Sequence, residues 1–513
     1  MRKQPNAKNL PYPPLKKGGA RSAGGFSRAS ISTALLAALT LAGCAVGPDY
    51  QRPEVPIPTQ WRLADGEMQT VAGLGWWRQF QDPVLDELVN IALRENKDLK
   101  IASARIEEYL GRYAFTRADQ FPQLGADASG DRTRTPGSSS LSGDSTIRNS
   151  FQAAALLSFE LDLFGRLRRA TESARAELLA TEEGWRTVIL SLITAVASNY
   201  VQLRSLDRQL DISRRTLDTR AESLRIARLR FKAGLTSELD VRQAEAEYQS
   251  AAVQVPQLET AVAQREDAIS LLLGRNPGAI ARGRALDRLA QPPVPGRPAL
   301  RNCWRGAPIS GRRNSNSIAA NANIGVAKAA YFPVISLTGL LGYISPQFED
   351  LFEGPSRTWN FGGGLTVPIF TAGKIAGQVA GGGGGSATGV GRITNKSIQT
   401  AFAEVEDNLI ALRKGRERLQ AQQAQTEAYR RYLKLAKLRY DNGYTSYLEV
   451  VDAERNLFNA ELATAQNQGD VLVALISLYK ALGGGWIERG GAGSVHCGGG
   501  PGHLSAAALL EAF

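Results

Sequence analysis

Cysteine, histidine and methionine are scarce in this 513-residue chain, which contains three, two and two of them. The cysteines and histidines are too scattered to supply the clustered ligands of a structural metal site. No serine, histidine and acid lie in a context that suggests a nucleophilic triad. We therefore expect no enzyme activity, no bound metal and no cofactor. The cysteines and histidines are Cys44, Cys303, Cys497, His496 and His503.

The chain also lacks a basic folded body, although its net charge is +12. Residues 1–43 hold seven Lys or Arg and no acid, and residues 275–317 hold nine Arg against the single Asp287. Together these two segments carry more positive charge than the net charge of the whole chain, so the remaining residues are slightly acidic. A nucleic-acid footprint would lie on the folded body. We therefore expect no nucleic-acid partner.

The apolar run near the N-terminus, 31–42, is too short to span a bilayer. It follows a basic stretch and ends in Leu41-Ala-Gly-Cys44, which is typical of a secretory signal removed with residues 1–43. A cysteine directly after the cut resembles the lipobox of bacterial lipoproteins, which implies lipid attachment at Cys44. Ala45, rather than an aspartate, then implies sorting to the outer membrane. The alternative is an ordinary signal peptide with an unrelated cysteine.

Two segments, 121–165 and 331–372, change from helical spacing to alternation of apolar and other residues. This pattern is typical of membrane-barrel strands, so we expect one β-hairpin in each segment. The alternative is a soluble hairpin subdomain. The expected outward-facing residues of the best-patterned strands are Phe151, Ala153, Ala155, Leu157, Phe159, Leu161, Leu163, Trp359, Phe361, Leu365, Val367 and Ile369.

Four strands cannot close a barrel, and lipid does not tolerate an open strand edge. If these strands span a membrane, several copies of the chain must share one barrel. Three copies would give 12 strands, an even number within the known range. We therefore expect a homotrimer.

The two helical segments, 166–275 and 373–486, contain the same tip motif. Residues 224–245 align without a gap on 433–454 at an offset of 209, with 11 of 22 positions identical. Each copy has a charged helix, a glycine in a polar break and a second helix with a Ser cap. This spacing is too long for a solenoid repeat, which favours duplication of a whole subdomain. We expect two helical hairpins related by an internal two-fold repeat.

The segment between Leu167 and Phe231 contains no proline and only one glycine, which predicts the first long helix. At the rise of an α-helix, 65 residues extend about 100 Å. The apolar residues recur at three and four positions, as in a coiled coil. Expected helices over 236–273 and 98–119 would together match this length. An ordinary coiled coil would not explain why each helical block adjoins a barrel-type strand.

Ordered motifs over most of 44–486 make the chain resemble the outer-membrane factor family, the TolC/OprM-like channels of tripartite efflux pumps. The resemblance is closest to the lipoprotein branch, with its resistance-nodulation-division (RND) efflux systems. The motifs are Gly47-Pro-Asp-Tyr-Gln-Arg-Pro53, Trp76-Trp77, Asp82-Pro83, Asp162-Leu-Phe-Gly-Arg166, Leu273-Gly-Arg-Asn-Pro277, Ala319-Ala-Asn-Ala-Asn-Ile-Gly325, Tyr331-Phe-Pro333, Ala401-Phe-Ala-Glu-Val-Glu406 and Leu478-Tyr-Lys-Ala-Leu-Gly-Gly-Gly-Trp486.

The resemblance implies a mixed α+β membrane channel, in which a coiled-coil α-helical barrel continues a trimeric 12-stranded β-barrel. It also implies export of drugs or other small solutes, with a periplasmic membrane-fusion adaptor and an inner-membrane RND transporter as partners. Residues 44–120 would form the lipid-anchored segment and first helices. Two alternatives remain open: a type I protein-secretion channel of the same fold, and a periplasmic adaptor lipoprotein.

Three stretches depart from the family pattern. They are residues 296–317, within the linker and helix of 276–330, the glycine run 381–396 and the glycine-rich tail 487–513. Each glycine in a helix interior costs about 1 kcal/mol relative to alanine, so the second long helix should be weakened at its start. We hypothesise local frame errors, with genuine insertions as the alternative. An uninterrupted gene read would exclude frame errors.

The candidate site residues lie at the two tips and just beyond the second. Small polar turn residues allow close approach of another helical hairpin, so the tips are candidate adaptor contacts, with simple helix capping as the alternative. They are Gly234, Leu235, Thr236 and Ser237, and Gly443, Tyr444, Thr445 and Ser446.

Leu448, Asp452 and Arg455 share one face of the helix that follows the second tip. The resemblance implies that they form the periplasmic gate, as a leucine constriction, an aspartate ring and an arginine bonded to a neighbouring helix. The alternative is an intrahelical surface pair of Asp452 and Arg455.

Overall fold

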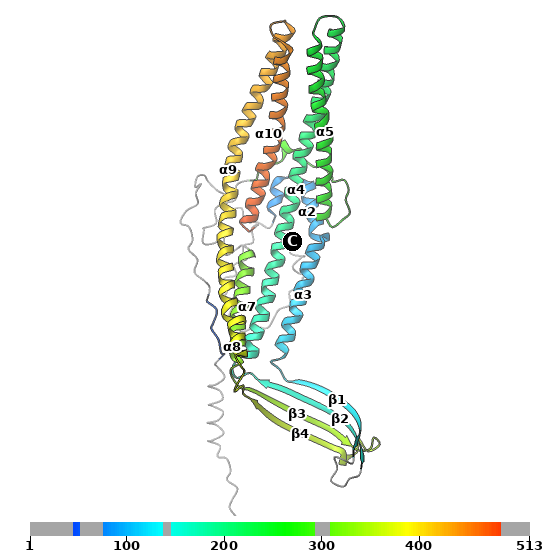
Figure 1. Cartoon of the computed structure of the whole chain (residues 1–513), viewed down its shortest axis with the longest axis vertical. Helices are drawn as coiled ribbons and strands as arrows, with labels where there is room; N and C mark the ends of the chain where they lie inside the picture. Colours follow the sequence, from blue (N-terminus) through cyan, green and yellow to red (C-terminus); the bar gives the residue numbers. More distant parts are fainter. Residues whose placement is uncertain (1–44, 52–74, 137–144, 293–307, 484–513) are drawn as a thin grey trace, which may run out of the picture.

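The computed structural model describes residues 45–51, 75–136, 145–292 and 308–483. Four long helices run side by side to two tips, and one β-sheet lies at the opposite end (Figure 1). Cys44 and the expected signal and tail, 1–43 and 487–513, lie outside the described residues.

The elements occur in the same order twice along the chain. A 22-residue helix leads to a strand pair, which leads to a long helix and a returning helix of 35 residues. The first set is α3 (Lys97–Ala118), β1 (Gln123–Thr135), β2 (Thr146–Leu161), α4 (Arg166–Lys232) and α5 (Glu238–Leu272). The second set is α7 (Pro308–Ala329), β3 (Val334–Ser345), β4 (Arg357–Thr366), α9 (Ser386–Asp441) and α10 (Tyr447–Ala481).

Shorter elements complete these two sets. Preceding α3 are the 3-10 turn η1 (Trp76–Phe80) and α2 (Pro83–Glu95). The remaining elements are η3 (Leu286–Arg288), η4 (Gly354–Ser356), α8 (Lys374–Gln378) and η5 (Val379–Gly385).

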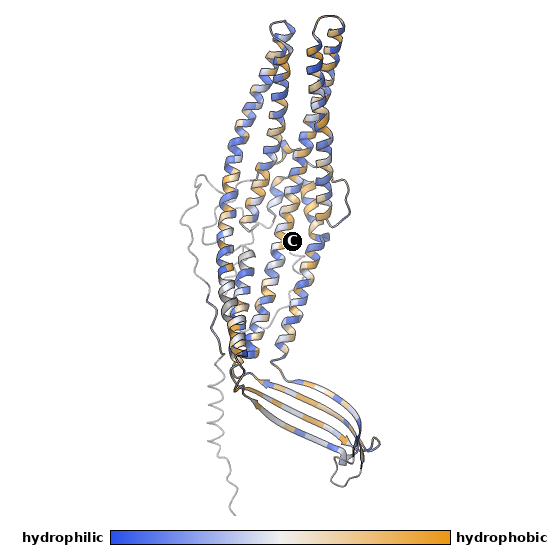
Figure 2. Cartoon of the chain, viewed as in Figure 1, coloured by the Kyte–Doolittle hydropathy of each residue, from blue (hydrophilic) through white to orange (hydrophobic). Residues whose placement is uncertain are grey.

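The strands form one antiparallel sheet in the order β1-β2-β3-β4. Aligned pairs include Ala126 with Ala155 and Leu341 with Trp359. Aromatic and aliphatic side chains on β4 are exposed, with Trp359 66% and Phe361 68% accessible, and Figure 2 shows apolar residues recurring along the sheet. The outer edges of β1 and β4 have no strand partner within the described chain.

The strand ends differ from the sequence prediction. Leu163 lies beyond β2 because the chain turns after Leu161, and the Asp162 carboxylate accepts hydrogen bonds from the amides of Leu167 (3.1 Å) and Arg168 (2.8 Å) to cap α4. Val367 and Ile369 lie beyond β4, where Pro368 cannot donate to a strand ladder.

The main core lies at mid-height, where η1 and α2 pack on α4 and α10. Trp76 stacks on Tyr479 with ring centroids 5.1 Å apart. The buried Asp82 caps α2 and accepts hydrogen bonds from the Tyr200 hydroxyl (2.8 Å) and the Arg284 amide (2.9 Å). A single buried carboxylate thus joins three segments that are distant in sequence.

The glycine run at the start of the second long helix is helical in the structure. Residues Val379–Gly385 form a π-helical turn that leads into α9. A π-turn is wider than an α-turn and is rare as a regular helix. The helical path expected for 373–486 is therefore continuous through the off-pattern residues.

Candidate functional site

The two tips have the same backbone. Gly234 and Gly443 adopt left-handed conformations with φ of 72° and 74°, which a residue without Cβ adopts at little cost. In each tip the glycine and the next residue close the helix end with two amide-to-carbonyl hydrogen bonds, the arrangement of a Schellman motif. The bonds join Gly234 to Phe231 (2.9 Å), Leu235 to Arg230 (2.9 Å), Gly443 to Tyr440 (3.0 Å) and Tyr444 to Arg439 (2.8 Å).

Each tip presents one large side chain to solvent directly after its glycine. Leu235 is 77% exposed and Tyr444 is 78% exposed. No atom lies within 4 Å of the position that a Cβ would occupy on either glycine. The structure thus leaves an open surface at both tips, which carries one apolar or aromatic side chain next to the glycine.

The polar residues of the tips are used within the tips. The Thr236 hydroxyl donates to the Asp240 carboxylate, and the Thr445 hydroxyl donates to the Glu449 carboxylate. Ser237 accepts a hydrogen bond from the Asp240 amide at 3.4 Å and so caps α5. Ser446 occupies the cap position of α10 without a side-chain cap bond. Helix capping, the alternative interpretation, therefore explains the presence of some of these polar residues.

The proposed gate residues lie together on the first turns of α10. Leu448 is 57% exposed, and an Arg455 guanidinium nitrogen lies 3.0 Å from the Asp452 carboxylate. The other carboxylate oxygen of Asp452 accepts a hydrogen bond from the side-chain Nδ2 of Asn456 at 2.9 Å. In a single copy the charged pair is therefore intrahelical, as the alternative interpretation has it. Sequence reasoning missed Asn456, whose i, i+4 spacing from Asp452 was the available signal.

Behind this helix, a buried arginine joins the two hairpins. The Arg220 side chain of α4 is 2% exposed, and one of its nitrogens lies 2.8 Å from the Glu247 carboxylate of α5. Its guanidinium also lies over the Phe458 ring of α10, 5.1 Å from the centroid. Burial lowers the pKa of Arg220, while the charges of Glu247 and Glu454 oppose that shift.

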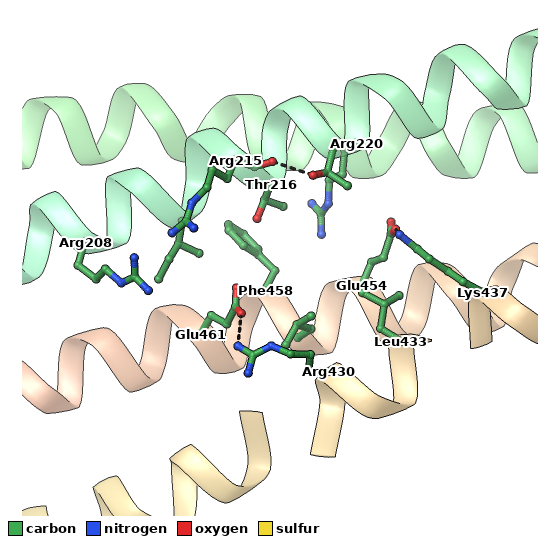
Figure 3. Close-up of a pocket in the computed structure, with 13 residues that line it drawn as sticks. Arg208, Arg215, Thr216, Arg220, Arg430, Leu433, Lys437, Glu454, Phe458 and Glu461 are labelled. Atoms are coloured by element: carbon green, nitrogen blue, oxygen red, sulfur yellow. Dashed lines mark hydrogen bonds and ion pairs between the residues drawn. The ribbon is translucent and has the colours of Figure 1, made fainter. Parts of the chain in front are cut away.

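Arg220 forms part of the wall of a groove of about 410 Å³ between α4, α9 and α10, in which Arg208, Arg430 and Glu461 also lie (Figure 3). The cations of this groove have acidic partners: Arg430 pairs with Glu461 at 2.9 Å, and Arg208 with Asp211 at 2.9 Å. The lining nevertheless holds more Arg and Lys than Asp and Glu, so this junction between the hairpins keeps an excess of positive charge. It was not predicted from the sequence.

At the tips, a second contact joins the hairpins. The Arg230 guanidinium of α4 lies 5.4 Å from the centroid of the Tyr440 ring and 3.5 Å from the Asp441 carboxylate, both on α9. Cation–π contacts contribute about 0.5–1 kcal/mol at exposed sites. This contact holds the two tips of one chain together.

Residues 45–51, which follow Cys44, lie against the junction of the sheet and the helices. The Val46 amide donates to the Phe164 carbonyl (3.0 Å), and Asp49 pairs with the buried Arg169 of α4 (2.7 Å). Gly47 fits closely over the backbone of Gly325 in α7. The segment that follows Cys44 is therefore fixed beside the strand ends.

In the part of the chain that the structure describes, no group of three or more His, Cys, Asp or Glu residues could hold a metal ion. A search of the same residues for a helix of sufficient length and apolar character to cross a membrane found none.

The family model of the outer membrane efflux protein matches residues 88–275 and 316–484. The chain belongs to this family, whose members are outer-membrane efflux channels of tripartite pumps and not enzymes. It is an outer-membrane protein that extends into the periplasm.

Among relatives, the chain is 39% identical over 464 residues to the solvent efflux pump outer membrane protein SrpC of Pseudomonas putida, covering 89% of this chain and 98% of that protein. It is 35% identical to the outer membrane protein OprJ of Pseudomonas aeruginosa, covering 89% and 96%. The solved outer-membrane channel OprN superposes with a TM-score of 0.81 at 29% identity, covering 86% of this chain and all of that one. These similarities favour the efflux channel over the secretion channel and the adaptor.

Proposed function

We propose that three copies of this chain share one β-barrel of 12 strands, which continues into a tube formed by their long helices. The observation that carries this proposal is the open sheet. β1 and β4 have unpaired outer edges, while exposed Trp359, Phe361 and Leu365 suit a lipid-facing surface. Because unpaired backbone groups are costly in lipid, β4 of one copy pairs with β1 of the next.

The number of copies is tested in detergent. Mass photometry should give about three times the mass of the mature chain, and chemical crosslinking should stop at three. A stable monomer extracted from membranes would contradict the shared barrel.

The closed state of this channel depends on the helix after the second tip. Three-fold symmetry brings three copies of Asp452 toward one axis, where their charges repel anions and attract cations. Arg455, paired with Asp452 within one copy, is also available to a neighbouring helix when the copies assemble. Leu448 adds an exposed apolar ring one turn closer to the tip.

The tips form the contact with a periplasmic membrane-fusion adaptor, which connects the channel to an inner-membrane transporter of the RND type. Exposed Leu235 and Tyr444 provide apolar contact area, and the glycines leave room for the partner's backbone. The channel itself is passive, and the transporter supplies the driving force.

The cargo consists of small organic solutes, including drugs. Similar proteins are named for efflux of solvent, toluene and antibiotics. A deletion strain should become more sensitive to organic solvents and to several unrelated antibiotics, and the intact gene should restore growth. Unchanged sensitivity across both panels would contradict this cargo class.

Cys44 carries the lipid anchor, on the grounds of the Leu41-Ala-Gly-Cys44 sequence and the close docking of the residues that follow it. Mass spectrometry of the mature protein should show an acylated N-terminal cysteine. A mature chain that begins at any other residue would remove the assignment. Cys44→Ser leaves the barrel strands unchanged and tests the anchor alone.

A further inference from the structure

The register of the sheet defines its two faces. Residues paired across antiparallel strands point to the same side, and successive residues of one strand point to opposite sides. Trp359 and Phe361 of β4 pair with Leu341 and Gly339 of β3, so all four share the face proposed to meet lipid. A Cβ on Gly339 would lie 3.1 Å from the Phe361 ring, as expected for residues on one side. The opposite face would then line the lumen of the shared barrel.

This second face is polar or without side chains along most of its length. Toward the helices it carries Ser158 opposite Thr338, with Gly362 next in the same row. Toward the far end of the sheet it carries acids such as Asp127. A barrel filled with water is expected to have such an interior. A pair of large apolar side chains on this face is therefore an exception.

Two leucines form such a pair halfway along the strands. Leu156 of β2 lies directly opposite Leu340 of β3. Leu156 is 39% exposed and Leu340 is half-buried. Direct neighbours across two strands have Cβ atoms about 5 Å apart, so the two side chains form one apolar surface. Within the four described strands, the other large apolar residues of this face are Val334 and Ile344, which pair with Thr366 and Gln152.

Small residues leave the leucine pair open to the lumen. Its row across the sheet consists of Gly125, Leu156, Leu340 and Asn360. No atom lies within 4 Å of the position that a Cβ would occupy on Gly125, so Leu156 has no side-chain neighbour on that flank of the row. In the next row, the buried Ala154 lies opposite Gly342. We call Leu156 and Leu340, with Gly125 beside them, the leucine shelf.

Charged side chains lie on either side of the leucine shelf and not in its row. Asp127 pairs with Ala154 one row toward the far end of the sheet. Glu160 lies two rows toward the helices, where it pairs with Arg166 at 2.7 Å. Apolar surface left in water is unfavourable, so an apolar solute that covers the shelf is bound. The shelf thus suits a neutral solute and supplies no partner for an ion.

The size of the leucine shelf limits its occupant. The next rows of the same face lie about 7 Å away along the strands, and one of them is polar at Ser158 and Thr338. A partner helix or strand would have to cover several rows, most of them polar. A solute with one aromatic ring can cover the two leucines alone.

We infer that the leucine shelf binds small neutral hydrocarbons, of the size of one aromatic ring, in the lumen of the channel. The inference rests on the proposed shared barrel, in which three copies would present three shelves at one level. It deepens the proposed cargo class, because it gives apolar solutes a binding site that ions lack. Binding must stay weak there, since a solute that enters the channel must also leave it.

Protection of a thiol beside the leucine shelf tests this assignment. In full-length protein with Cys303→Ser and Cys497→Ser, reconstituted in lipid nanodiscs, Gly125→Cys places a thiol next to Leu156 in open space. A charged methanethiosulfonate reagent should label this thiol through the aqueous lumen. Toluene near saturation should slow the labelling at least three-fold.

Ser129→Cys is the matched control for general effects of toluene. It lies on the same face of β1, four residues and about 14 Å from position 125, and its labelling rate should not change. Leu156→Thr with Leu340→Thr keeps residues that favour strands and should abolish the protection of Gly125→Cys. Ser158→Thr with Thr338→Ser changes the neighbouring row and should leave the protection intact.

Each other outcome contradicts a defined part of the account. Labelling of Gly125→Cys at the same rate with and without toluene would overturn the leucine shelf while leaving the barrel intact. Failure of the charged reagent to label either thiol would instead overturn the lumen assignment, and with it the shared barrel. Equal slowing at both positions, or slowing that survives removal of the leucines, would contradict a specific site.

Discussion

The two hairpin tips have one backbone but different side chains beyond it. Gly234 and Gly443 share conformation and hydrogen bonding. Leu239 and Leu448, five residues further on, are both exposed leucines. The copies diverge one turn later, where the charged pair of the second hairpin corresponds to Gln243 and Ala246 in the first. The shared features thus belong to the scaffold, and the differences lie at the residues proposed as the gate.

The arginines that precede the two tips differ in the same way. Arg230 reaches across to the other hairpin, whereas its repeat equivalent Arg439 pairs with Glu449 of its own hairpin at 3.0 Å. A duplicated scaffold therefore carries unlike contacts at equivalent positions. The following substitutions test that contrast.

The largest effect is expected from bulk at the tips. Gly234→Trp and Gly443→Trp should each abolish efflux, measured as drug sensitivity of the complemented deletion strain, because the side chain would fill the open docking surface. Trimer yield should stay at the wild-type level, since a Cβ meets no neighbour at either position. Gly443→Ala is the control for backbone strain, which costs about 1–2 kcal/mol in a left-handed residue. Normal efflux in both Trp variants would mean that the tips are not docking surfaces.

A smaller effect, on stability, is expected from Arg220→Met. The substitution leaves Glu247 without its buried partner, which should cost about 3 kcal/mol. The melting temperature of the detergent-solubilised protein should fall by several degrees. Arg228→Met is the matched control, because Arg228 is half exposed and pairs with Glu245 at 3.2 Å, and exposed pairs contribute less than about 1 kcal/mol. Equal melting temperatures would show that the junction of the hairpins does not depend on Arg220.

The sequence was sufficient for the helices and tips because their signals are local. The glycines, the Ser residues that follow them and the absence of proline in 167–231 mark the ends of hairpin helices without any distant contact. Alternation similarly marked the strands, although β2 begins at Thr146, ahead of Phe151, the first of its expected outward-facing residues. Polar residues such as Arg148 and Asn149 belong to the strand because pairing with β1 supplies hydrogen-bond partners for their backbone groups.

Long-range contacts were not predictable in the same way. Arg220 is one of many arginines in a charged helix, and only the packing of α5 and α10 identifies it as buried. The carboxylate of Asp82 was noted only as part of a motif, although it binds segments more than 100 residues away. Such residues have no periodicity of their own, and their role depends on tertiary structure.

The central claim is that the gate belongs to the second hairpin, and planar-bilayer recording tests it most directly. Single-channel conductance should rise several-fold in Asp452→Ala with Arg455→Ala, and vancomycin uptake by cells should increase in parallel. The equivalent change in the first hairpin, Gln243→Ala, should leave the conductance at the wild-type level. Wild-type conductance in the double variant, or an equal rise in Gln243→Ala, would contradict the account.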